Sequence, residues 1–237
     1  MTTTDTTTPS SPTPSTSGSP SGAGSLQPDD PRTVFAKAVG LAGWVIEATT
    51  PDQLDLPTPC QALDVRGLLG HLTDVMERVR RIGAGEDPMG NELLDVSTVA
   101  DDAWFDLFRT RADAVQDAWT DPAALERTVA LPWATTSGAG MLANYTSELT
   151  VHTWDLATAT DQHPQWDDEV IAVGFDAIRR GLPVDGRQAR FDQIVAGLPA
   201  ELRPPPPFGE AVEVSDDASA IDQLVAWTGR RPCPPTV

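Results

Sequence analysis

The fold of this chain depends on one segment, MLANYTSELTVHTWDLATA at residues 141–159. Wound as a helix of about 3.6 residues per turn, this segment places its apolar residues on one stripe: Met141, Tyr145, Leu149, Leu156 and Ala159. Glu148 and His152 fall inside the stripe, one helical turn apart. Because an unpaired buried carboxylate is costly, the helix needs a cation, a hydrogen-bond network or a solvated cavity beside it.

Hydrophobic periodicity predicts further helices on both sides of this segment. They are expected over residues 31–48, 65–82, 97–119, 167–181 and 217–228. Asp64 is placed to cap the second of these helices, and Gly83 and Gly85 to end it. The pattern predicts an all-α fold, most simply a four-helix bundle with additional C-terminal helices.

The connecting segments are expected to be extended or irregular. Residues 128–133 are rich in β-branched and apolar side chains and predict a short extended piece, followed by a turn at the SGAG of residues 137–140. Residues 182–207, which end in a run of prolines, are expected to be irregular, and residues 208–214 extended.

Composition separates one domain from its tails. Residues 1–30 are mostly Thr, Ser, Pro and Gly, which cannot bury enough apolar surface to offset the entropy of ordering. We therefore expect a disordered N-terminal tail, a single helical domain over residues 31–232 and a short tail at residues 233–237.

Charge and hydropathy exclude several classes of partner. The chain carries 16 Lys and Arg against 35 Asp and Glu, a formal net charge of −19, so nucleic acid and anionic membranes are poor partners. No apolar run approaches the roughly 18 residues of a membrane span, and the N-terminus lacks a signal-peptide pattern. We expect a cytoplasmic protein. Cys60 and Cys233 lack the spacing of a zinc site or a redox pair.

A metal site is the chemistry that the residues favour. Two ligands one turn apart on a helix normally take a third ligand from a facing helix. Of the other two histidines, His163 precedes a proline in a loop, which leaves His71 on the second helix. A His-Glu-His set suits zinc, nickel or iron and leaves a position open for water or substrate. The alternative is a buried Glu148–His152 pair, bridged to an arginine, with a purely structural role.

Three further side chains have two interpretations each. Asp155 either orients a ligand through a hydrogen bond or is a carboxylate on the helix surface. Tyr145 either offers its hydroxyl to a substrate or packs in the core. Cys60 either supplies a thiol near the site or is buried and inert. The chain lacks GxSxG, GxGxxG and GxxxxGK motifs, so triad and nucleotide chemistries are unsupported.

Three segments resemble a known family. PTPCQALDVRGLLGHL (57–72), ELTVHTWDLATAT (148–160) and FGEAVEVSDDASAIDQLVAWTGRRP (208–232) are similar to motifs of the DinB-like, mycothiol-dependent maleylpyruvate isomerase metal-binding family, in its shorter subgroup. The sequence departs from the motif at Leu63, where tryptophan is usual. Because little beyond one helix follows the proline run, the separate C-terminal domain of the isomerases is not expected, and maleylpyruvate isomerase activity is not carried over.

The resemblance implies an up-down-down-up bundle that binds one divalent metal ion, usually zinc, through His71, Glu148 and His152. It also implies that the metal activates mycothiol or a similar small thiol toward an electrophilic substrate; a homodimer is left open. The leading hypothesis is therefore a thiol-dependent transferase or isomerase. The competing hypothesis is a non-catalytic metal-binding or sensing bundle.

Overall fold

A computed structural model describes residues 1–2, 30–90, 92–197, 199 and 208–232. Apart from residues 1–2 and 30, the predicted N-terminal tail lies outside the described residues, as does the predicted tail at 233–237. Within the described part, the chain is mostly helical, as predicted, with one small hairpin of two strands.

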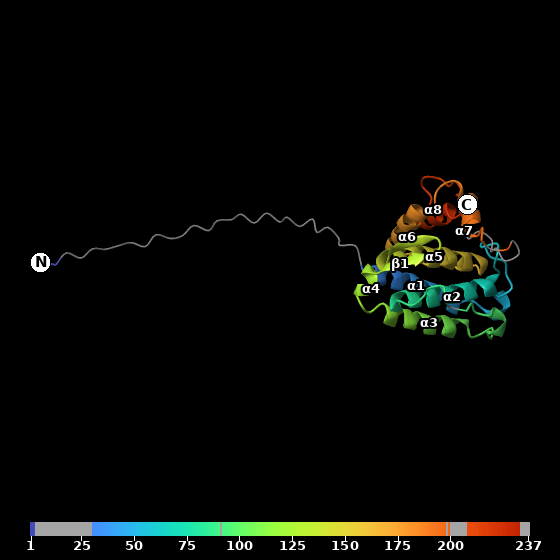
Figure 1. The fold of residues 1–237 in the computed structure, drawn as a ribbon, viewed down its shortest axis with the longest axis horizontal. Coiled ribbons are helices and arrows are strands. Elements are labelled where there is room, and N and C mark those ends of the chain that lie inside the picture. The colour runs from blue at the N-terminus through green and yellow to red at the C-terminus, as the bar shows by residue number, and fades with distance from the viewer. Residues whose placement is uncertain (3–29, 91, 198, 200–207, 233–237) are drawn as a thin grey trace.

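Four long helices form the body of the molecule (Figure 1): α1 (Pro31–Glu47), α2 (Val65–Ala84), α3 (Trp104–Ala118) and α5 (Gly138–Ala159). The helix α5 packs against α1 and α2, and α3 packs against the same two helices. The main hydrophobic core lies between them and includes Phe35, Leu68, Leu72, Phe108 and Leu149. The predicted segment 141–159 therefore lies at the centre of the fold.

Local capping explains where α2 and α5 begin. The Asp64 carboxylate accepts a hydrogen bond from the Gly67 amide, which confirms the predicted cap, and α2 ends at Gly85 with a positive φ of 74°. Ser137 caps α5 by accepting a hydrogen bond from the Gly140 amide at 3.2 Å. The prediction of a turn over SGAG was therefore wrong, because a serine cap makes these residues the first turn of α5.

A two-stranded hairpin precedes α5. After the short helix α4 (Ala123–Glu126), β1 (Thr128–Leu131) pairs in antiparallel fashion with β2 (Ala134–Ser137). The predicted extended piece at 128–133 thus covers the first strand and the turn. The second strand was missed because its partly exposed ATTS sequence carries no alternating pattern of apolar residues.

Three other segments differ from the prediction. The helix expected from residue 97 begins at Trp104; before it lies a 3₁₀ turn, η2 (Val96–Thr98), capped by the Asp95 carboxylate. The stretch expected to be irregular contains α7 (Arg187–Ile194). Residues 208–214 form no strand. The Val212 amide instead donates a hydrogen bond to the carbonyl of Ala226, which lies in the helix α8 (Ala220–Trp227).

A second layer covers the outer side of α5. The helices α6 (Asp168–Gly181) and α8 (Ala220–Trp227) form a second apolar cluster with Val151 and Trp154 of α5. The remaining buried members of this cluster are Ile171, Ile178, Ile221, Leu224 and Val225. Because α5 is covered on two sides, even its polar residues are largely buried.

The helices of the described residues are not suited to crossing a membrane, since none combines sufficient length with sufficient apolarity.

Candidate metal centre

The structure brings the three predicted ligands together. Glu148 Oε1 lies 3.1 Å from His71 Nε2 and 3.5 Å from His152 Nε2. The two imidazole rings meet edge to face, with their centroids 4.6 Å apart. One ligand atom from each residue fits within 4.8 Å of the others. His71 comes from α2, and Glu148 and His152 come from α5, which packs directly against it.

These distances suit a metal ion. Nitrogen and oxygen ligands at about 2.1 Å from a tetrahedral zinc ion lie roughly 3.4 Å from one another, close to the two separations that Glu148 makes. Two imidazoles and one carboxylate are also the donor types that zinc, nickel and iron accept. The residues therefore fit a single divalent cation held by three side chains.

The site is buried at one end and accessible at the other. The His152 side chain is only 3% exposed, whereas those of Glu148 and His71 are 22% and 31% exposed. A ligand from solvent can therefore approach from the side of His71 and Glu148. The buried end holds His152 in a fixed environment.

Opposite charges govern protonation in the metal-free site. Burial would raise the pKa of Glu148, but its hydrogen bonds to His152 and His71 hold that pKa well below its usual range. Burial would lower the pKa of His152, but Asp155 and Glu148 together raise it to about 9. Without a metal, Glu148 is thus ionised and His152 is its cationic partner.

Asp155 fixes the orientation of His152. It is fully buried, so it is not a carboxylate on the helix surface, and its Oδ2 lies 3.0 Å from His152 Nδ1. A hydrogen bond from Nδ1 to a carboxylate leaves Nε2, the nitrogen that faces Glu148, free to bind a metal ion. The geometry favours the predicted orienting role.

Arg230 is a residue of the site that the sequence did not predict. Its Nε and one terminal nitrogen donate to the two carboxylate oxygens of Asp155, at 3.1 and 2.8 Å. It follows α8 and is only 6% exposed. The structural alternative predicts an arginine beside the Glu148–His152 pair, but this arginine contacts Asp155 instead. The one signal for Arg230 in the sequence is its place in the Arg-Arg-Pro that ends the C-terminal motif at residues 208–232.

Tyr145 and Cys60 lie next to this centre. The Tyr145 ring is buried, its hydroxyl has no hydrogen-bond partner among the described residues, and burial raises its pKa to about 12. Cys60 is half-buried, and its sulfur lies within 4.8 Å of ligand atoms of His152 and Asp155. Burial raises the pKa of the Cys60 thiol. Because Arg230 already engages Asp155, these three do not form a second cation site. His163 is exposed, outside the centre.

A family model matches the part of the chain that holds the three candidate ligands. Residues 35–157 match the family model described as mycothiol maleylpyruvate isomerase N-terminal domain. The chain belongs to this family. The match to the mycothiol maleylpyruvate isomerase N-terminal domain family contains all three proposed ligands and Asp155, whereas Arg230 lies beyond it.

Two curated relatives match a longer part of the chain than the family model does. They are the uncharacterized proteins MT0763 and Rv0738 of two Mycobacterium tuberculosis strains, CDC 1551 and H37Rv. Each is 27% identical over 203 residues, which cover 85% of this chain and 98% of the relative. No solved structure gives a significant match.

Proposed function

We propose that the protein binds one divalent metal ion through His71, Glu148 and His152 and uses it to activate a small thiol. The observation that carries the proposal is the convergence of these side chains on one Glu148 oxygen, with a buried second carboxylate orienting His152. Zinc is the metal we expect first, and nickel or iron also suit the donors. The family match over residues 35–157 further supports an up-down-down-up bundle, and we propose one domain over residues 31–232.

The chain's own residues have separate tasks in this proposal. His71, Glu148 and His152 hold the ion, which when bound lowers the pKa of a coordinated thiol so that a thiolate forms at neutral pH. Asp155 keeps His152 Nε2 directed at the site. The exposed side of His71 and Glu148 admits mycothiol or a similar thiol and the electrophilic substrate with which it reacts. We propose transfer or isomerisation in the cytoplasm; a homodimer is left open.

A non-catalytic metal-binding or sensing bundle is the second candidate. One observation favours it: the buried hydrogen bonds from His152 to Asp155 and from Arg230 to Asp155 hold the ligand set in place without any substrate. A sensor needs such a fixed ion site and no bound substrate. The behaviour of the ion toward thiols separates the two candidates.

Metal analysis of protein purified without a histidine tag tests the site. We expect about one equivalent of metal, and a rise in Tm when zinc is added to metal-free protein, because a ligand that binds only the folded state stabilises it. His152→Ala should lose the metal and keep the helical circular dichroism spectrum. His163→Ala, at an exposed histidine, is the matched control and should bind metal normally. Full metal content in His152→Ala would refute the assignment.

Cobalt substitution separates enzyme from binding module. Adding a small thiol at millimolar concentration should change the visible spectrum of the cobalt form, because thiolate coordination alters both ligand field and charge transfer. An unchanged spectrum would favour the non-catalytic bundle.

A further inference from the structure

Arg78 lies on α2, two turns after His71 and on the same side of the helix. Its guanidinium stacks 5.9 Å from the centroid of the Trp133 ring, which belongs to the turn of the β1–β2 hairpin and is exposed. Its Nε is buried without a hydrogen-bond partner among the described residues. A stacked guanidinium still presents its N–H edge to a ligand.

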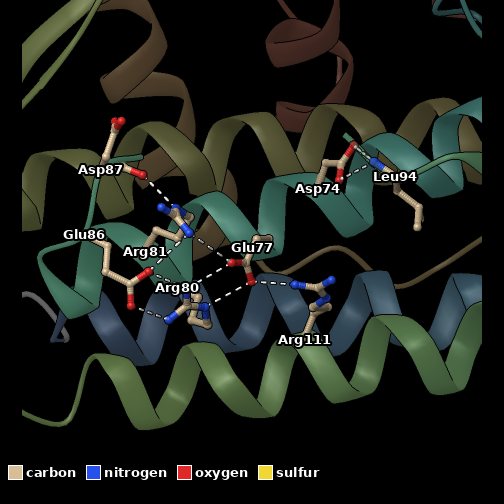
Figure 2. A network of polar contacts seen from close by, with 8 residues as sticks. All are labelled: Asp74, Glu77, Arg80, Arg81, Glu86, Asp87, Leu94 and Arg111. Carbon is tan, nitrogen blue, oxygen red and sulfur yellow. Dashed lines mark hydrogen bonds and ion pairs between the residues drawn. The ribbon is translucent and has the colours of Figure 1, made fainter. Parts of the chain in front are cut away.

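The carboxylates nearest to Arg78 in sequence are engaged elsewhere (Figure 2). Glu77 accepts from Arg80 at 3.0 Å and from Arg111 at 2.6 Å. Both oxygens of Asp74 lie 3.2 Å from the Leu94 amide. Arg80 has a second partner, Glu86. In a chain with a large excess of acidic residues, Arg78 thus has no ion-pair partner among the described residues.

The Tyr145 hydroxyl is the second donor at this position. Tyr145 precedes Glu148 by one turn of α5, is only 6% exposed, and its hydroxyl has no hydrogen-bond partner in the described structure. Burial is the largest effect on its pKa; the nearby Arg78 guanidinium lowers this pKa by its charge and its N–H groups, and Glu148 raises it, so Arg78 and the Tyr145 hydroxyl are neighbours even though no hydrogen bond of normal geometry joins them. A buried donor left unsatisfied destabilises the protein, and a ligand acceptor would satisfy it.

We propose that Arg78 and Tyr145 bind an oxyanion of the electrophilic substrate, a carboxylate or a phosphoryl group, next to the metal centre. The inference rests on the proposed function, because it gives the substrate of that site its chemical class. A guanidinium fork and a hydroxyl are a donor set for a planar or tetrahedral oxyanion. The Arg78 Nε and the Tyr145 hydroxyl are both buried without a hydrogen-bond partner among the described residues, and one oxyanion could accept from both.

Titration with two probes tests the site. We would add benzoate and, separately, inorganic phosphate to the metal-loaded and the metal-free full-length protein and follow binding by calorimetry and Trp fluorescence. We expect one probe to bind with a Kd on the order of millimolar in both forms. Arg78→Gln should weaken it about 10-fold or more, with unchanged metal content. Preference for benzoate identifies a carboxylate substrate, and preference for phosphate identifies a phosphoryl group.

Two further variants keep the test decisive. Tyr145→Phe should weaken the probe severalfold without lowering Tm, because the lost hydroxyl has no partner within the described structure. Arg109→Gln, at an exposed arginine paired with Asp106, is the control and should bind the probe like the wild type.

The outcomes separate the two proposals. Equal affinity in wild type and Arg78→Gln, or no binding of either probe at 100-fold above the expected Kd, overturns the oxyanion site and leaves the metal site standing. Arg78-dependent binding in a protein that takes up no metal supports the oxyanion site and overturns the proposed function.

Discussion

Asp155 connects the candidate metal centre to the C-terminal part of the chain. Its carboxylate accepts from His152 on one side and from the Arg230 guanidinium on the other, and all three side chains are buried. The orientation of His152 therefore depends on a residue 75 positions further along the chain from Asp155. Metal-ligating histidines are commonly tuned by such partners.

Arg230→Lys tests this dependence. Lysine keeps the charge but cannot donate two parallel hydrogen bonds to one carboxylate, so Asp155 should hold His152 less firmly. We expect zinc affinity to fall about 10- to 100-fold and Tm to fall as well. Arg109→Lys, at the exposed Asp106 pair, should leave both unchanged. Zinc affinity like that of the wild type in Arg230→Lys would show that Arg230 stabilises the fold without acting on the metal.

Metal affinity should depend on pH through His152. Its pKa of about 9 means that the metal-free protein carries a proton there at pH 7, and a metal ion requires the neutral imidazole. Binding should therefore release about one proton at pH 7, and affinity should rise roughly tenfold per pH unit until the pH approaches 9. Calorimetry in buffers of different ionisation enthalpy measures the release. A binding enthalpy independent of buffer would contradict the ion-pair description of the metal-free site.

At the scale of secondary-structure elements, the sequence predicted what local chemistry determines. Asp64 caps α2 through an amide three residues further on, and Glu148 and His152 lie four residues apart on α5. Both relationships span about one helical turn, so they hold in any helix. Asp167 caps α6 where that helix was expected to begin. His71 could be selected because so few histidines were available, and the structure places it 3.1 Å from Glu148.

Elements that depend on tertiary contacts could not be predicted in this way. Arg187, at the start of α7, is buried and donates to the carbonyls of Pro183, Gly209 and Trp227, so distant backbone groups hold this short helix. The β1–β2 hairpin is similar, since Trp133 at its turn stacks on Arg78 of α2. The pairing of Arg230 with Asp155 likewise joins residues that no sequence period relates.

At the scale of the whole molecule, α5 belongs to both hydrophobic clusters. Leu149 and Leu156 lie in the main core with α1, α2 and α3, whereas Val151 and Trp154 lie in the cluster with α6 and α8. Neither cluster can lose its packing without exposing one side of α5. Arg230 adds a buried ion pair between the two parts.

We therefore expect residues 31–232 to unfold as one cooperative unit. Calorimetry of the metal-free protein should show a single transition whose calorimetric and van't Hoff enthalpies agree, coincident with Trp fluorescence, since Trp104 lies in one cluster and Trp154 in the other. Saturating zinc should raise this Tm without splitting the transition, because its proposed ligands lie on α2 and on the shared α5; His152→Ala should show no such rise. Two separate transitions would mean that the layer of α6 and α8 unfolds independently of the four-helix body. The Arg230–Asp155 ion pair would then not link the stability of that layer to the candidate metal centre.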